Sequence, residues 1–311
     1  MPASIELVRA GNWLFATGVR GLATPELFRR IEAALVEAGS SMSRVARLDQ
    51  YYADFSCVAP YQAARKQAFE GRQVAPSTSV VVSRLKDSAS QVDLQVLAAT
   101  AESGYVPREI DTGLNRPDTS AYAPCLRVGD LIFVAGQLAR DASGTLAARG
   151  VAAETRYILE RRLLPALEAA ESALDLVLKA QVYVSGDVGE FRGVWPDALP
   201  TTVIPVRHPA FLTREASVEI NLIAAHGSAR SRVRDIEGRA RLLDGLLFVG
   251  GLNALTQAAE IFAAAGTDLT RVVRALFFHA AGAAPAAAAF PYTAVEVQAG
   301  TTIDLWGYAP Q

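Results

Sequence analysis

The sequence predicts an α+β protein made of three tandem copies of one β-β-α-β-β unit. The first observation is a short strand-like segment that occurs three times, as GNWLFATG (11–18), GDLIFVAG (129–136) and DGLLFVGG (244–251). The copies are nearly evenly spaced, and each carries a phenylalanine and ends on glycine. The second observation is that the segments after each copy also align, in the same order. Regular self-similarity of this size indicates one structural unit per copy.

A segment with helical periodicity follows each copy of the short strand. Apolar residues recur at three- and four-residue steps in 25–39, 152–171 and 257–266, which predicts helices with one buried face. Pro25 and Gly39 suit the start and the end of the first helix.

The remaining strands of the unit also occur three times. A turn with Ser, Asp or Thr leads into a β-branched and aromatic strand in 40–53, 172–185 and 267–280. Two closing strands then follow in each copy: PSTSVVV (76–82) with VDLQVLA (92–98), PTTVIPV (200–206) with VEINLIA (218–224), and PYTAVEV (291–297) with IDLWGYA (303–309).

The three copies differ between their third and fourth strands. Residues 55–71 predict a second helix in the first copy, whereas 189–199 are a shorter segment and 281–290 an alanine-rich connector. Linkers rich in Pro, Gly, Ser and charge lie near 102–122 and 226–239. We therefore expect units at 1–101, 102–226 and 227–311.

Composition and charge narrow the class of protein. Hydrophobic residues make up 51% of the chain, charged residues 20%, and the net charge is −2. No basic surplus predicts nucleic-acid binding, and no apolar run approaches the length of a membrane span. Two cysteines and three histidines without metal-like spacing predict neither disulfides nor a metal site. No cofactor motif is found, no signal peptide is seen, and a cytoplasmic location is expected.

The aligned segments resemble the Rid family of YjgF-type enamine/imine deaminases. The best match is the second copy, with YAPCLRVGDLIFVAGQL (122–138), PTTVIPV (200–206) and VEINLIA (218–224). The resemblance implies the chorismate-mutase-like α+β fold, which normally forms a homotrimer with a central β barrel and outer helices. Three copies in one chain would then form a single-chain pseudo-trimer, monomeric or in a low-order homo-oligomer. Small-molecule sites would lie in the clefts between neighbouring units.

At two positions that are catalytic in the family, this chain carries other residues. The arginine that binds the substrate carboxylate is replaced in all three copies, by Thr78, Thr202 and Thr293. The glutamate near the last strand is likewise replaced, by Gln95, Asn221 and Trp306. A hydroxyl cannot form the two charge-assisted hydrogen bonds that a guanidinium donates to a carboxylate. We therefore expect weak or absent turnover of simple amino-acid-derived imines.

The second copy holds the densest set of candidate site residues. The family tyrosine is present there as Tyr122, and Glu219 lies on the last strand. Arg207 is a candidate replacement for the lost arginine, and His208 is the best general acid/base by residue type. We therefore predict four catalytic residues: Tyr122, Arg207, His208 and Glu219. The predicted substrate-binding residues are Cys125, Trp195, Thr201, Thr202 and Asn221.

Several candidates have a structural alternative. Cys125 is either an activated nucleophile or a buried packing residue. His208 is either catalytic or a turn residue before Pro209. An acid recurs as Asp93, Glu219 and Asp304, and such recurrence also fits a structural salt bridge.

Two classes of function remain open. The first is an enzyme for hydrolysis, deamination or tautomerisation of an enamine, an imine or a related carboxylated metabolite, for which specialised metabolism is a natural setting. A chorismatase-like hydrolase is a variant of that class. The second is a non-catalytic protein that binds a small metabolite.

Overall fold

The computed structural model describes residues 5–114, 122–283 and 290–310, whose strands form three open sheets. The first sheet has the order β1 (Leu7–Ala10), β2 (Trp13–Gly21), β6 (Val92–Ala99), β3 (Val45–Tyr52), β4 (Ser77–Val81). The second has the order β11 (Thr201–Pro205), β10 (Val177–Val184), β12 (Val218–Ala225), β9 (Leu131–Gln137), β8 (Cys125–Val128), β7 (Arg108–Glu109). The third has the order β13 (Arg234–Ile236), β14 (Ala240–Leu243), β15 (Leu246–Val249), β18 (Thr301–Tyr308), β16 (Val272–His279), β17 (Thr293–Glu296), β5 (Arg84–Leu85).

The same pairing pattern recurs in the three sheets. The third and fourth strands of the repeat pair in parallel, as β3 with β4, β10 with β11 and β16 with β17. The other neighbouring strands are antiparallel, and the last strand of each repeat lies between the short strand and the third strand. The mixed α+β class predicted from the repeat is therefore confirmed.

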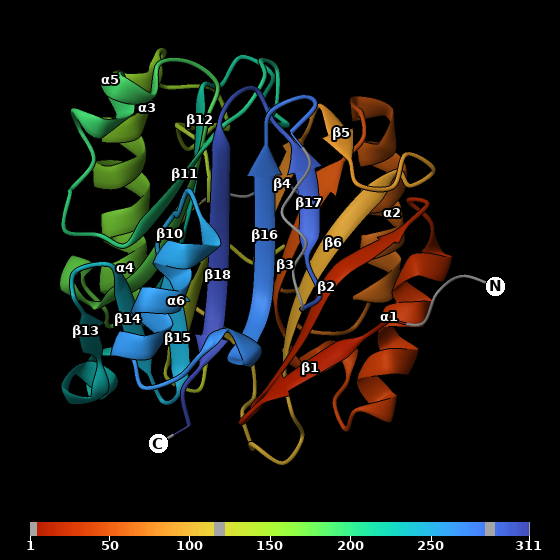
Figure 1. Cartoon of the computed structure of the whole chain (residues 1–311). Coiled ribbons are helices and arrows are strands. Elements are labelled where there is room, and N and C mark those ends of the chain that lie inside the picture. Colours follow the sequence, from red (N-terminus) through yellow and green to blue (C-terminus); the bar gives the residue numbers. More distant parts are fainter. Residues whose placement is uncertain (1–4, 115–121, 284–289, 311) are drawn as a thin grey trace.

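Helices cover the outer faces of the sheets (Figure 1). Helices α1 (Pro25–Glu37) and α2 (Val58–Ala68) lie on the outside of the first sheet. A continuous helical segment covers the second sheet; it consists of α3 (Val151–Ile158), a π-helical turn (Leu159–Leu163) and α4 (Leu164–Ala169). Helix α6 (Leu255–Ala264) packs on the third sheet.

The second helix of the repeat differs between the copies, as the sequence predicts. The first copy has the eleven-residue α2, and the second has only the five-residue α5 (Val188–Arg192). Part of the alanine-rich connector of the third copy, 284–289, lies outside the described residues.

The inner faces of the sheets share two hydrophobic clusters. The repeated phenylalanines Phe15, Phe133 and Phe248 meet in one of them, together with Trp13 and Trp306. The other cluster contains side chains from the opposite ends of the third strands, namely Tyr51, Tyr183 and Phe278. The phenylalanine that is repeated on the short strand therefore packs at the contact between the units.

The closed central barrel expected from the resemblance is not confirmed, because none of the described sheets closes on itself. Between sheets, side-chain packing dominates, and backbone hydrogen bonds are isolated. One example is the bond of 3.1 Å from Gly251 N to Thr201 O. Among the described strands, one short ladder joins elements of different copies, between β5 and β17. Among the described helices, none is long and apolar enough to cross a membrane.

Candidate functional site

The three sheets meet at three junctions. The last strand of each copy carries an acid at the same position of the repeat, and the surroundings of this acid can be compared between the junctions. This acid is Asp93 on β6, Glu219 on β12 and Asp304 on β18. All three carboxyl groups are buried. Their partners differ, and this difference separates one junction from the other two.

At the junction of the second and third sheets, the recurring acid is Asp304, and it is ion-paired. Lys179 and Arg274 lie 2.8 and 2.9 Å from its carboxylate oxygens. Burial favours the neutral acid, but these two cations outweigh it and hold the pKa of Asp304 below its usual value. Gly251 packs against Thr202 so closely that an added Cβ would lie 3.1 Å from its Cα. This junction therefore has its acid in ion pairs and its backbones in contact.

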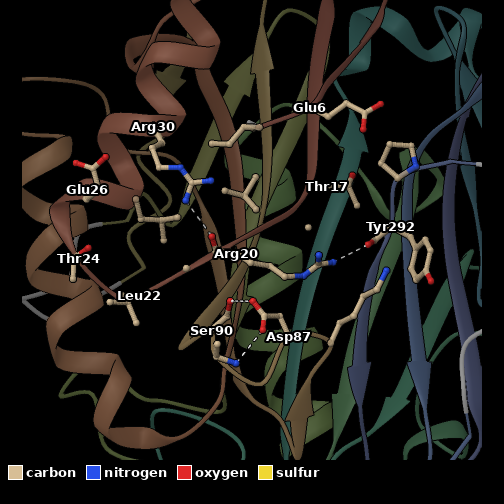
Figure 2. Close-up of a pocket in the computed structure, with 18 of the residues that line it drawn as sticks. Glu6, Thr17, Arg20, Leu22, Thr24, Glu26, Arg30, Asp87, Ser90 and Tyr292 are labelled. Carbon is tan, nitrogen blue, oxygen red and sulfur yellow. Dashed lines mark hydrogen bonds between the residues drawn. The ribbon is translucent and has the colours of Figure 1, made fainter. Parts of the chain in front are cut away.

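The junction of the third and first sheets contains a cleft of about 750 Å³ around Arg20 and Tyr292 (Figure 2). Arg20 donates to Asp93 at 2.8 Å and to the backbone oxygen of Tyr292 at 3.1 Å. Thr293 also donates to Asp93, at 2.8 Å. Burial raises the pKa of Asp93 to about 6, and Arg20 limits the rise. The acid at this junction is thus also paired with a cation.

The junction of the first and second sheets holds a cleft of about 440 Å³, which we call the Glu219 cleft. The first sheet and α2 contribute Gln62, Ser77 and Ser79 to its wall. The second unit contributes Tyr122, Gly136, Leu138, Arg140, Leu212 and Glu219. Because β4 of one copy faces β9 and β12 of the next, the cleft lies between neighbouring copies.

Glu219 differs from its two counterparts in its electrostatic environment. Its side chain is 5% exposed, and within the described part of the chain no cation lies in ion-pair distance. Burial raises its pKa to about 8, while the backbone N–H of Ser79 and the charge of Arg140 oppose the rise. Glu219 therefore remains largely protonated at neutral pH.

The backbone at Gly136 leaves the space that the Glu219 carboxyl occupies. A Cβ added at Gly136 would lie 1.9 Å from Oε1 of Glu219, which is far inside contact distance. Gly136 is not in the left-handed region, so the requirement for glycine is one of space. The glycine that ends the short strand thus also fixes the position of the acid.

Arg140 brings a positive charge to the Glu219 cleft. It follows β9, lines the Glu219 cleft and donates through Nη2 to the hydroxyl of Thr213. Its Nε is buried and has no protein partner. Arg140 can therefore offer a further N–H to an anionic group in the cleft.

Of the nine residues predicted from the sequence, the structure places Tyr122 and Glu219 in this cleft. Arg207 and His208 are exposed, and Nδ1 of His208 lies 3.2 Å from the hydroxyl of Ser185. Neither lines the Glu219 cleft. Burial raises the pKa of the Cys125 thiol to about 12, which leaves almost no thiolate at neutral pH.

The other predicted binding residues contact protein groups. Trp195 stacks on Phe191 and donates to Thr201 at 2.8 Å. Thr202 accepts from Lys179 at 3.2 Å. Asn221 donates to the hydroxyl of Thr78 at 2.9 Å. These side chains link units or brace the strand ends, and none lines the Glu219 cleft.

Sequence reasoning missed Arg140, Gly136 and Ser79 as parts of a site. In the sequence, Gly136 is recognisable only as the glycine that ends the short strand. Arg140 lies four residues after it. Ser79 belongs to another copy, so only the packing of the copies brings it to Glu219. No cluster of His, Cys, Asp and Glu within the described ranges could hold a metal ion.

Fold and cleft together give an α+β chain in which a repeated strand pattern forms three sheets, with a cleft lined by a buried acid and an arginine at one junction. Residues 113–226 match the family model described as Endoribonuclease L-PSP. The resemblance to the Rid family is thereby confirmed for the middle of the chain, where the Glu219 cleft has its acid and its arginine.

Solved structures give similarities over different shares of the chain. A chorismatase crystal structure is similar with a TM-score of 0.58 and 15% identity, covering 72% of this chain and 78% of that one. A YjgF/YER057c/UK114 family member from Mycobacterium tuberculosis is 29% identical, with a TM-score of 0.28, over 30% of this chain and 84% of its own. A Rid family protein from Yersinia pestis is 18% identical, with a TM-score of 0.34, over 39% and 99%. No curated protein matches this chain. The chorismatase similarity, at this identity, concerns the fold alone.

Proposed function

We propose that this chain is an enzyme that transfers a proton to a small carboxylated substrate in the Glu219 cleft. The reaction class is hydrolysis, deamination or tautomerisation of an enamine, an imine or a related compound. The observation that carries the proposal is a buried acid with a pKa of about 8, in a cleft of about 440 Å³ that also holds an arginine. Strongly perturbed acids in clefts are typical of catalytic sites.

The protonation state of Glu219 suits a general acid. A neutral carboxylic acid at pH 7 can protonate the β-carbon of an enamine, which gives an iminium ion and leaves Glu219 as a carboxylate. Water then adds to the iminium carbon while this carboxylate accepts one of its protons, which restores the neutral acid and gives a carbinolamine. The hydroxyl of the carbinolamine passes its proton to the amine, so that ammonia leaves as the carbonyl forms.

Arg140 and Tyr122 supply binding and orientation in this proposal. Arg140 would hold the substrate carboxylate, in place of the family arginine that is Thr78 at this junction. Tyr122 lines the same cleft and corresponds to the family tyrosine. Arg207→Ala and His208→Ala test whether their loop, which also supplies Leu212 to the cleft wall, contributes to activity.

The experiment compares Glu219→Gln and Arg140→Met with the exposed control Glu215→Gln, on 2-aminoacrylate generated in situ and on larger carboxylated enamines. Removing the general acid is expected to lower kcat by about 10²- to 10⁴-fold. Arg140→Met is expected to act mainly on KM. Activity of the wild-type chain should fall as pH rises through about 8, when Glu219 ionises. Full activity of Glu219→Gln with unchanged folding would refute the proposal.

A second candidate is a chorismatase-like hydrolase, since a chorismatase has a similar fold over 72% of this chain. Chorismate belongs in the same substrate panel, and its consumption with loss in Glu219→Gln would identify this variant. Binding of a panel compound by calorimetry without turnover would instead indicate a metabolite-binding protein.

We also propose that the units at 1–101, 102–226 and 227–311 form a single-chain pseudo-trimer that acts in the cytoplasm. The support is the inner packing of all three sheets within one chain. Sedimentation is expected to show a monomer or a low-order oligomer. An obligate trimer with each copy packed only on its own kind would contradict this.

A further inference from the structure

We propose that the substrate of the Glu219 cleft carries two carboxylates, one bound by Arg140 and the other by the hydroxyl of Ser77, with the buried Arg65 behind it. This is a narrower substrate class for the proposed function, on which it rests only in placing the substrate in this cleft. The basis is a buried positive charge at the cleft wall that no described carboxylate balances.

Arg65 lies on the buried face of α2, and its side chain is 0% exposed. Its Nη1 donates to Oγ of Ser77 and its Nη2 to the backbone oxygen of Ala75, both at 2.7 Å. Its Nε is buried and has no protein partner. Burial lowers the pKa of Arg65, but a guanidinium stays protonated at neutral pH. Arg65 therefore keeps its positive charge inside the protein.

The partners of Arg65 are neutral oxygens. Among the described residues, no carboxylate lies within ion-pair distance of its guanidinium. Asp49 acts on Arg65 electrostatically, but the oxygens of Asp49 already accept from Arg47 and Arg274. A buried charge without a counter-ion is costly. An anion bound in the neighbouring cleft would offset part of this cost.

The lining of the Glu219 cleft adds little negative charge at neutral pH. Among the described lining residues Glu219 is the one acid, and burial raises its pKa to about 8. Arg140 is the one cation of the lining, and its buried Nε has no protein partner. Arg65 interacts electrostatically with Tyr122, which lines the cleft from the second copy. Two positive charges thus face a largely neutral acid, which favours a dianion over a monoanion.

Ser77 connects Arg65 with the inside of the cleft. It lies on β4, lines the cleft and is 8% exposed. Its oxygen accepts from Arg65, and a serine hydroxyl has one proton of its own to donate. Within the described chain no protein acceptor takes this proton. The hydroxyl can therefore donate to a carboxylate in the cleft, and hydrogen bonds in series strengthen one another.

The helix that supplies Arg65 is at full length in the first copy. Helix α2 has eleven residues and also contributes Ala59 and Gln62 to the cleft wall. In the second copy α5 has five residues, and its one arginine, Arg192, is exposed. The corresponding segment of the third copy, 281–290, contains no basic residue. A buried cation from this helix is therefore particular to the junction that holds Glu219.

Calorimetry with 2-oxo acids tests the proposal without turnover. Straight-chain 2-oxo dicarboxylates of four to seven carbons are each compared with the monocarboxylate of the same chain length, at constant ionic strength. The wild-type chain should bind at least one dicarboxylate about ten-fold more tightly than the matching monocarboxylate, as expected for an added hydrogen bond to a charged group. Equal affinities throughout the series would overturn the proposal.

Ser77→Ala removes the hydroxyl and leaves Arg65 in place. This variant should lose the preference for the dicarboxylate and keep the affinity for the monocarboxylate, whereas a purely structural role would lower both affinities. Ser90→Ala is the matched control: Ser90 is 6% exposed and donates to Asp87 at 2.8 Å, but does not line the cleft. It should keep the preference. An unchanged preference in Ser77→Ala would also overturn the proposal.

Turnover of the same pairs as imines separates this proposal from the proposed function. The imines are formed in situ from the corresponding amino acids by an amino-acid oxidase. Turnover without a preference for any dicarboxylate imine would refute the second carboxylate site and leave the proposed function in place. Selective binding of a dicarboxylate without turnover of any imine would support the site and refute the proposed reaction.

Discussion

Replacing Glu219 with glutamine is expected to change the stability of the fold in a way that depends on pH. The folded pKa of Glu219 is about 8, against an ordinary value of 4.5. The unfolded chain therefore releases this proton at lower pH than the folded chain does. For a buried acid with a raised pKa, stability is highest below pH 4.5 and falls as pH rises towards 8.

The size of the effect follows from the two pKa values. They differ by about 3.5, and one pH unit corresponds to about 1.4 kcal/mol. Linkage then predicts that wild type loses about 4 kcal/mol of its free energy of unfolding between about pH 5 and pH 8.5 through this group alone. Glutamine cannot ionise, so Glu219→Gln should lack this loss.

The assay is urea denaturation of wild type, Glu219→Gln and the exposed control Glu215→Gln at both pH values. The stability difference between Glu219→Gln and wild type should shift by about 4 kcal/mol in favour of the variant at the higher pH. The control should follow wild type. A difference that is equal at both pH values would show that Glu219 is not a buried neutral acid, and the reasoning about its chemistry would fail with it.

Three further outcomes are expected. Gly136→Ala should cost about 1–3 kcal/mol in stability and reduce activity by displacing Glu219; Gly193→Ala, where an added Cβ meets nothing closer than 3.6 Å, is its control in a thermal melt. The Cys125 thiol should resist iodoacetamide in the native chain and react in urea, as mass spectrometry can measure, and rapid native labelling would contradict its burial. Lys179→Met should cost about 3–5 kcal/mol because it leaves a buried carboxylate with one cation fewer, and a urea midpoint close to wild type would show that the pair contributes little.

The strand and helix order could be predicted because each copy repeats the same periodicity. Three weak patterns in register support one another, so β3, β10 and β16 lie where 40–53, 172–185 and 267–280 predict them. The open arrangement of the sheets could not be predicted, since it depends on how side chains fill the junctions between copies.

The candidate site was predictable only in part. Tyr122 and Glu219 belong to the copy that best matches the family, and both lie in one cleft. Arg140 was not predicted, because a cation was expected either at the position of the family arginine or in the turn that holds Arg207 and His208. The recurring acid was ambiguous for a physical reason: Asp93 and Asp304 have ion-pair partners from other strands, and sequence spacing does not show which acid lacks one.

The pairing of β5 with β17 has a consequence for how the chain reaches its native state. Leu85 lies opposite Val295, and Arg84 opposite Glu296, so the last sheet takes its edge strand from the first copy. Contacts between residues so distant in sequence form slowly, because a long loop must close first. During synthesis, β17 emerges long after β5, and the first copy must leave that edge available until then. A chain that lacks either β5 or β17 would leave the other strand with an unpaired edge, at which other molecules can add. Because such edges promote aggregation, we expect selection to keep the three copies in one chain.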